Sequence, residues 1–271
     1  MPIIQSDMRV HHSRIQPLEI WDALTPAGTL WESMDHPDFA IHLGDVLNQL
    51  LTGTAHSRAD GALTQVDFDQ IWLSGGRLLC SETVRSLSSL PRETFVAMDA
   101  RFPGIAAATK ILPGSVDTTL CVDVGQTSIK MTLAEYRMVV SRNFDEFPIR
   151  QHGNDTPSLS KQHRFLQWLV KSIQTLAVPS DKNFKLLLSL PCEIADDGTL
   201  GGSSYIGVIG CTDTAAVLTQ HLSVNSVHLL NDAELAAWAA MADTRVPASG
   251  NTLVLTLGFS VRAALIMAEN I

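Results

Sequence analysis

Apolar residues occupy every second position on both sides of a short polar turn in residues 120–133. This spacing is typical of strands with one buried face, so it predicts a β-hairpin that turns at Gly125 and Gln126. A third antiparallel strand is predicted after the hairpin, over residues 135–143, before a polar loop.

Short apolar runs and runs with helical spacing follow each other along the rest of the chain. Further strands are predicted over residues 69–73, 94–98, 184–190, 227–230, 252–258 and 261–267. Apolar positions three and four residues apart predict helices over residues 103–112, 158–177, 212–222 and 233–242. The same spacing predicts two or three helices between residues 14 and 51, the last over residues 37–51. Alternating strands and helices predict an α/β protein of two lobes.

The composition limits the kinds of partner that the protein has. The chain has 271 residues, 45% of them apolar, and its formal net charge is -9. This acidic balance, without a cluster of Lys or Arg, argues against nucleic acid and against an anionic membrane surface as partners. No apolar run approaches the ~20 residues that span a bilayer, and the N-terminus does not resemble a signal peptide. We therefore expect a cytoplasmic protein.

The cysteines do not form a metal-binding pattern. Cys80, Cys121, Cys192 and Cys211 are far apart and include no Cys-x-x-Cys pair. Two of them, Cys80 and Cys121, lie in or beside runs that predict strands. We therefore expect reduced thiols in the core and no structural zinc.

The turn of the predicted hairpin carries side chains that suit a phosphate and a metal ion. Asp123 can hold a hydrated Mg²⁺, and backbone N–H groups near Gly125 can approach phosphate oxygens. Thr127 and Lys130 add a hydroxyl and a positive charge. An ordinary hairpin turn explains the same residues equally well.

A second candidate lies where the strand predicted over residues 227–230 meets the next helix. Asp232 stands at the carboxyl end of that strand, where active sites of α/β proteins gather, and it can accept a proton from a substrate hydroxyl. The alternative is structural. Asn231 and Glu234 have the spacing of a capping box, and the motif alone favours this second interpretation.

Two further turns carry glycine after a predicted strand. Residues 256–262 form a second hairpin turn, whose backbone N–H groups can contact phosphates. Residues 74–76 join a strand to a helix and can let a nucleotide approach the backbone closely. Plain turns explain both segments as well.

Together these segments resemble the motifs of the ROK family of sugar kinases, within the superfamily of actin-like ATPases. Asp123-Val-Gly-Gln-Thr-Ser-Ile-Lys130 is similar to the first phosphate motif of the family, and Asn231-Asp232 to its substrate and catalytic-base motif. Thr256-Leu-Gly258 is similar to the start of the second phosphate motif, and Ile71-Trp-Leu-Ser-Gly-Gly76 to the adenosine motif. Pro17-Leu-Glu19 resembles the segment whose glutamate binds sugar hydroxyls.

The order of these motifs is unusual, because the adenosine motif precedes the first phosphate motif. The resemblance therefore implies a two-lobed actin-like ATPase (ribonuclease H-like) fold that is circularly permuted. Residues 1 to about 115 would correspond to the carboxyl-terminal portion of the family, and residues 119–271 to its beginning. One lobe is expected over residues 118–248, and the other over residues 1–117 with residues 249–271.

Some positions depart from the family pattern. Gly258-Phe-Ser-Val-Arg262 stands where the family has Gly-Thr-Gly-x-Gly, so Arg262 either replaces phosphate contacts by charge or blocks the site. Gln126 stands at a usual glycine, and Gly201-Gly-Ser-Ser-Tyr205 lacks the asparagine that reads sugar hydroxyls. The zinc loop of the family has no counterpart. His11 or His12 stands for its sugar-binding histidine, although a pair of surface histidines is the commoner explanation.

The resemblance implies ATP-dependent phosphorylation of a hydroxyl on a sugar or sugar-like polyol. Asp232 would be the general base, and Mg-ATP would bind between the lobes, with Asp123 as the Mg²⁺ residue. The implied ATP and phosphate contacts are Asp123, Gly125, Gln126, Thr127, Lys130, Gly258, Phe259, Ser260, Ser74, Gly75 and Gly76. The implied substrate contacts are Asn231, Asp232, Glu19, Gly202, Ser203 and His12. A homodimer is compatible with the resemblance.

The alternative is a catalytically inactive relative that binds a sugar or nucleotide as a sensor or as a partner of another protein. The altered turn at Gly258 favours this alternative. The joint presence of Asp123, Thr127, Lys130 and Asp232 favours the enzyme, because a pure binder does not need a base beside a metal carboxylate. A DNA-binding repressor of the same family is not expected, since the chain shows no basic helix-turn-helix segment.

Overall fold

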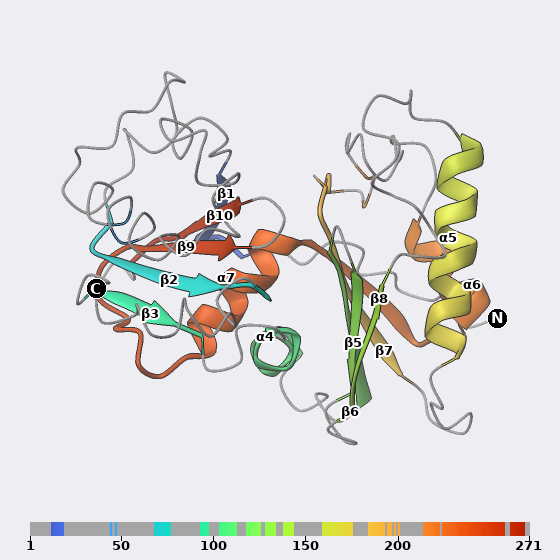
Figure 1. The fold of residues 1–271 in the computed structure, drawn as a ribbon, viewed down its shortest axis with the longest axis horizontal. Coiled ribbons are helices and arrows are strands. Elements are labelled where there is room, and N and C mark those ends of the chain that lie inside the picture. Colours follow the sequence, from blue (N-terminus) through green and yellow to red (C-terminus); the bar gives the residue numbers. More distant parts are fainter. Residues whose placement is uncertain are drawn as a thin grey trace. The chain divides into compact units, whose positions relative to one another are not determined.

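The structure is a computed structural model, and it forms two compact units. It describes residues 12–18, 44, 47, 68–76, 93–97, 103–112, 118–125, 128–133, 138–143, 159–175, 184–192, 194–196, 198, 200, 214–222, 224–257 and 261–268. Unit 1 comprises residues 1–11 and 108–235, and unit 2 comprises residues 12–107 and 236–271. Each unit contains a five-stranded mixed sheet (Figure 1).

The sheet of unit 1 has the strand order β6-β5-β4-β7-β8. Its strands are β4 (Thr119–Val124), β5 (Ser128–Leu133), β6 (Met138–Asn143), β7 (Lys185–Leu190) and β8 (Ser226–Asn231). Strand β5 is antiparallel to both β4 and β6, whereas β7 is parallel to both β4 and β8. The carboxyl ends of β4, β7 and β8 therefore meet at one edge of the sheet.

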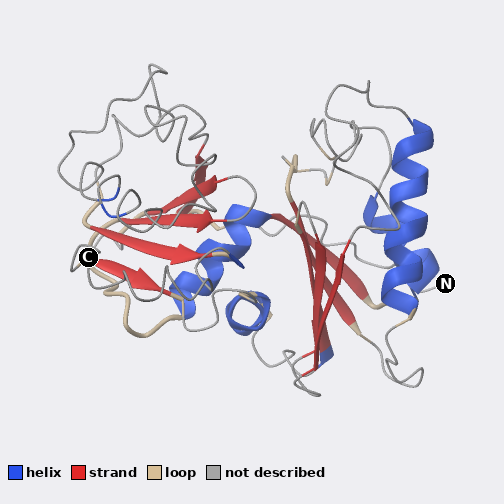
Figure 2. Cartoon of the chain, in the orientation of Figure 1, coloured by secondary structure: helices blue, strands red, loops and turns tan. Residues whose placement is uncertain are grey.

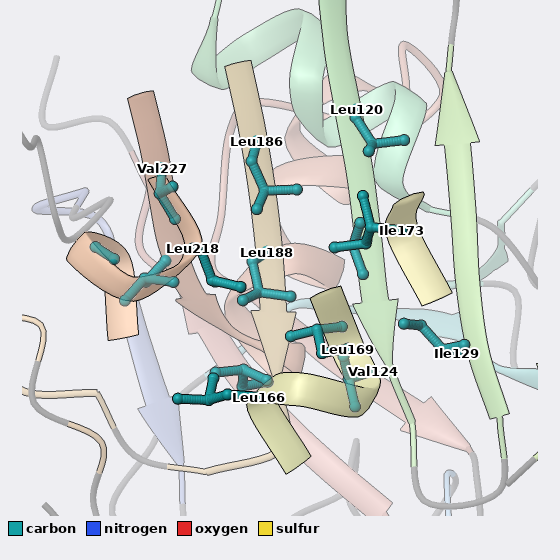
Figure 3. Close-up of a cluster of buried hydrophobic side chains, with 14 of the residues drawn as sticks. Leu120, Val124, Ile129, Leu166, Leu169, Ile173, Leu186, Leu188, Leu218 and Val227 are labelled. Atoms are coloured by element: carbon teal, nitrogen blue, oxygen red, sulfur yellow. The ribbon is translucent and has the colours of Figure 1, made fainter. Parts of the chain in front are cut away.

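Helices α5 (Leu159–Gln174) and α6 (Thr214–Leu222) pack on one face of this sheet (Figure 3). Leu166, Leu169 and Ile173 form a buried stripe on α5, because residues three and four apart lie on the same side of a helix. Alternate residues of the strands complete the core. They include Leu120, Val124, Ile129, Leu186, Leu188 and Val227.

The sheet of unit 2 has the strand order β1-β10-β9-β2-β3. Its strands are β1 (Ile15–Leu18), β2 (Gln70–Ser74), β3 (Thr94–Val96), β9 (Thr252–Leu257) and β10 (Val261–Ile266). Strand β10 is antiparallel to both β9 and β1, whereas β2 is parallel to both β9 and β3. Every residue of β2 is buried, which is typical of a central strand with parallel neighbours.

The two sheets share one pattern of strand pairing. Strands β9, β10, β1, β2 and β3 of unit 2 correspond in position and direction to β4, β5, β6, β7 and β8 of unit 1. The two sheets differ in how the strand beside β5 or β10 is connected along the chain. Strand β6 follows β5 along the chain, whereas β1 comes from the opposite end of the sequence from β10.

Two more helices are present, α4 (Gly104–Ile111) and α7 (Asp232–Ala242) (Figure 2). The sequence divisions between the units fall within these two helices. Helix α7 begins directly after β8, and its alanines 233, 236, 237, 239 and 240 are buried. Small side chains allow close packing along such a helix. Within the described residues, no helix is long and apolar enough to cross a membrane.

The α/β class is confirmed, and the predicted strands and helices are present from residue 69 onward, with ends that shift by a few residues. The prediction for the start of the chain is wrong, because Ile15–Leu18 forms an edge strand paired with β10 rather than a helix. Ile15 and Leu18 are both buried and have helix-like spacing. Pro17 is tolerated because an edge strand lacks a second neighbour. Of the helix predicted over residues 37–51, two residues are described, and both are helical.

Candidate active site

Both acidic residues that the sequence singled out lie where the parallel strands of the unit 1 sheet have their carboxyl ends. Asp123 is the last but one residue of β4, and Asp232 is the first residue of α7, directly after β8. Strand β7 lies between β4 and β8, so these two strands are about 10 Å apart. Edges of this kind are the usual location of sites in α/β proteins.

Lys130 forms an ion pair with Asp123 across the β4–β5 hairpin. The two residues are in register, and Lys130 Nζ lies 3.1 Å from Asp123 Oδ2. Their side chains are 19% and 16% exposed, so solvent screens the pair less than it screens a pair on the open surface. A cation that binds Asp123 must therefore compete with the ammonium group of Lys130.

Cys121 lies two residues before Asp123, on the same face of β4. Burial raises the pKa of the Cys121 thiol to about 12, and the negative charge of Asp123 adds to this effect. A raised pKa favours the protonated thiol at neutral pH, which is a poor nucleophile. In the described part of the chain, no group of three or more His, Cys, Asp or Glu side chains is placed to hold a metal ion.

Asn231 and Glu234 form the capping box that their spacing suggested. The side-chain Oδ1 of Asn231 accepts a hydrogen bond of 2.8 Å from the N–H of Ala233, and Glu234 Oε2 accepts one of 2.9 Å from the N–H of Asn231. The side-chain Nδ2 of Asn231 also donates a hydrogen bond of 2.7 Å to the carbonyl oxygen of Cys192. Asn231 thus joins the start of α7 to the segment that follows β7.

Asp232 occupies the first helical position beside this cap. It is half-buried, and its Oδ1 accepts a hydrogen bond of 3.0 Å from the N–H of Ala233. The positive end of the helix dipole stabilises a negative charge at this position. The cap therefore fixes the backbone of Asp232 and places its carboxylate at the edge of the sheet.

Ser189 is a residue at this edge that the sequence reasoning missed. It lies on β7, in register with Asp123 on one side and with Leu230 on the other. The residue is 1% exposed, and its hydroxyl has no hydrogen-bond partner among the described residues. The sequence contains an indication of this position, because Ser189 is the one residue with a hydroxyl group in the strand Lys185–Leu190.

The glycine turn after β2 lies in unit 2. Ser74 ends β2, and its hydroxyl lies 3.3 Å from the Thr256 hydroxyl of β9. Gly75 has φ +114°, and a Cβ atom there would lie 2.2 Å from the carbonyl oxygen of Leu257. The close approach of β9 thus explains this glycine without a ligand. A Cβ atom on Gly76 would meet nothing within 4 Å.

His12 also belongs to unit 2, and it is not an exposed side chain. Its ring meets Trp238 edge-on, with 4.8 Å between the ring centroids. The N–H of Arg14 donates a hydrogen bond of 3.1 Å to His12 Nδ1. These contacts hold the half-buried ring in the fold. Arg262, another half-buried residue of this unit, is in register with Thr256.

Nine predicted contact residues remain, of which the structure describes one. Gly125 follows β4 and is half-buried. Eight predicted site residues lie outside the described part of the chain: Glu19, Gln126, Thr127, Gly202, Ser203, Gly258, Phe259 and Ser260.

Comparisons with known proteins give structural similarity but no sequence match. No family model matches the chain, and no curated protein is significantly similar in sequence. An inorganic polyphosphate/ATP-glucomannokinase from Arthrobacter sp. strain KM is similar with a TM-score of 0.41 and 20% identity, over 55% of this chain and 58% of that one. A ROK family protein from Streptococcus pneumoniae TIGR4, in complex with sucrose, is similar with a TM-score of 0.35 and 19% identity, over 56% and 46%.

Both similarities thus span less than two thirds of the compared chains. A ROK family protein is among the solved structures that resemble part of this chain.

Proposed function

We propose that the protein is an ATP-dependent kinase that phosphorylates a hydroxyl on a sugar or sugar-like polyol. The observation that carries this proposal is the placement of two carboxylates at the carboxyl ends of β4 and β8, which are separated only by β7: Asp123 lies near the end of β4, and Asp232 directly follows β8. A Mg²⁺ ion lies about 2 Å from a carboxylate ligand, and a general base lies about 3 Å from the hydroxyl it deprotonates. Strands about 10 Å apart are compatible with one substrate that reaches both groups.

In the proposed reaction Asp232 accepts the proton of the substrate hydroxyl. The hydroxyl oxygen forms a bond to the γ-phosphorus of ATP, and the bond from that phosphorus to the β,γ-bridging oxygen breaks, so ADP leaves. Asp123 and Lys130 hold the phosphate end of the nucleotide at the edge of the sheet. Catalysis by such a site is mostly positioning and stabilisation of charge.

The residues at this place suit a hydrated Mg²⁺ ion rather than an ion whose ligands all come from the protein. Asp123 supplies one carboxylate, and no cluster of three acidic, His or Cys ligands exists among the residues described. Mg²⁺ usually keeps several waters and is held by one or two carboxylates together with substrate phosphates. The unpartnered hydroxyl of Ser189 beside Asp123 adds a polar group to the same place. The ion would neutralise charge on the transferred phosphate.

We also propose that the chain is a circular permutation of the fold that it resembles, with the two lobes expected from the sequence. The equivalence of the two sheets supports this proposal, because β9, β10, β1, β2 and β3 repeat the pairing of β4 to β8. The end of β10 and the start of β1 are also neighbours, since Met267 N–H donates a hydrogen bond of 2.8 Å to the carbonyl oxygen of Arg14.

The experiment is an assay of ATP turnover with a panel of hexoses, N-acetylhexosamines and cyclitols. We expect one class of these compounds to stimulate the release of ADP, and we expect a phosphorylated product in equal amount. Asp232→Asn should lower turnover by about 100-fold or more, because a general base contributes about 10²–10⁴-fold. The same variant should still bind ATP, since Asp232 acts on the acceptor.

A binding protein without catalysis is the second candidate. The engagement of Asn231 in the helix cap and in the bond to Cys192 favours it, because these contacts explain a motif residue without a substrate. Sugar or nucleotide binding without ADP release, in wild type and Asp232→Asn alike, would select this second function.

A further inference from the structure

Ser189 carries a buried hydroxyl that is not satisfied by any described residue. Its exposed fraction is 1%, and no hydrogen bond to its Oγ is present in the described part of the chain. A buried polar group without a partner lowers the stability of a folded protein. A serine at such a position in a strand of mainly leucines therefore points to a partner that Ser189 contacts only when the site is occupied.

The position of Ser189 identifies that partner. Strand β4 lies between β5 and β7, so Asp123 is in register with Lys130 on one side and with Ser189 on the other. Side chains in register on neighbouring strands lie on the same face of a sheet. The Asp123 carboxylate thus has two polar neighbours, and in this structure its Oδ2 pairs with Lys130.

The sheet of unit 2 shows how far a serine at this position reaches. Ser74 corresponds to Ser189, because it is in register with Thr256 of the central strand as Ser189 is with Asp123. The Ser74 and Thr256 hydroxyls are 3.3 Å apart, within the distance of a hydrogen bond. A serine placed like Ser189 therefore reaches the side chain beside it on the central strand.

We propose that Ser189 is a positioning residue for Asp123 and donates a hydrogen bond to its carboxylate when a Mg²⁺–phosphate ligand occupies the site. The inference rests on the proposed function, because it requires such a ligand at Asp123. With such a ligand bound, Asp123 would hold the ion in place of Lys130, and the ammonium group of Lys130 would pair with phosphate oxygens. The bond from Ser189 replaces the lost bond and fixes the orientation of Asp123, as outer partners do for metal ligands.

The test compares Ser189→Ala with Thr94→Val, which removes the other buried hydroxyl that lacks a partner among the described residues. Without ligand, each variant should raise Tm by ~2–4 °C, because each removes an unsatisfied polar group. Titration calorimetry should then show an affinity for Mg-ATP about tenfold lower for Ser189→Ala and unchanged for Thr94→Val. The affinity for ATP in excess EDTA should be unchanged in both variants.

Ser189→Thr keeps the hydroxyl and should bind Mg-ATP as the wild type does, even if its added methyl group lowers Tm. The inference is overturned if Ser189→Ala weakens ATP with and without Mg²⁺ equally, or weakens neither. In that case the proposed function stands, provided that the wild type binds Mg-ATP. If the wild type does not bind Mg-ATP, the proposed function fails and the role of Ser189 fails with it.

Discussion

The ammonium group of Lys130 lies 3.1 Å from Oδ2 of Asp123 and joins β5 to β4 at the edge where Asp232 also lies. This ion pair lies in the hairpin to which the proposal assigns the phosphate contacts. It neutralises the carboxylate that the proposal assigns to Mg²⁺, and it keeps beside it a positive charge that suits a phosphate.

We expect Lys130→Met to lower kcat/KM for ATP by about tenfold or more, since it removes a charge-assisted contact to phosphate. The free energy of unfolding should fall by only about 1 kcal/mol or less, because the pair is partly exposed. Steady-state kinetics and urea unfolding measure the two effects. Lys130→Arg, which keeps the charge, is the control, and equal kinetics in all three proteins would exclude a phosphate role for Lys130.

The hairpin that carries this pair was predictable because it is local. Alternating apolar positions on both sides of Gly125 predict the two strands and the turn. The pairing of Asp123 with Lys130 was not predicted, because a two-residue turn at Gly125 and Gln126 would place Asp123 opposite Ser128, whereas Val124 pairs with Ile129. The strand at Ile15–Leu18 was not predictable in this way, because its conformation depends on pairing with β10, at the other end of the chain. Local spacing alone favoured a helix there.

The state of Ser189 could not be read from the sequence either. Its lack of a partner depends on the orientation of the Asp123 carboxylate, which points to Lys130, and no local pattern contains that information. The capping box was predictable, since Asn231 and Glu234 lie three residues apart in one segment. The bond from Asn231 to Cys192 was not, because it joins the ends of two different strands.

Asn231→Ala should lower the free energy of unfolding by about 1–2 kcal/mol, because α7 loses its N-cap acceptor. Asn231→Asp separates the two roles of the side chain. It keeps an oxygen for the Ala233 N–H but cannot donate to the Cys192 carbonyl oxygen, so it should be intermediate between Ala and wild type. Urea unfolding of the three proteins measures this order. Equal stability of the Ala variant and wild type would contradict the role of the cap.

Gly75→Ala should destabilise unit 2 by about 2 kcal/mol or more. The added Cβ atom would lie 2.2 Å from the carbonyl oxygen of Leu257, and the φ of +114° disfavours any side chain. Gly76→Ala is the matched control, because its Cβ atom meets nothing within 4 Å. Thermal unfolding of both variants compares them directly, and a similar loss of Tm in both would show that the approach of β9 is not the cause.

Asp243 makes the stability of the fold depend on pH in the acid range, and this residue is not part of the candidate site. The side chain of Arg245 donates a hydrogen bond of 2.9 Å to Asp243 Oδ1, and this bond, together with one of 3.1 Å from the Trp72 indole, lowers the pKa of Asp243 to about 2. A lowered pKa stabilises the folded state above the unfolded pKa of about 3.9. That stability is lost as the pH falls through the folded pKa.

The wild type should therefore lose about 2 kcal/mol of stability between about pH 5 and pH 2 through this one group. Asp243→Asn should be less stable at pH 7 and should show a shallower loss in acid. Urea unfolding at pH 7, 5, 4 and 3 gives both slopes. Parallel slopes for the two proteins would assign the acid dependence to other carboxylates.

The equivalence of the two sheets leads to a prediction about the order of the chain. Joining Ile271 to Met1 and opening the chain between residues 113 and 117 would restore the strand order β4 to β8, then β9, β10, β1, β2 and β3. The link is feasible because Met267 and Arg14 are hydrogen-bonded at the ends of neighbouring strands. Loop closure depends only weakly on loop length, so the rearranged protein should fold with a stability within about 2 kcal/mol of the wild type. Circular dichroism and urea unfolding test this, and a rearranged chain that does not fold would argue that the present order is required rather than interchangeable.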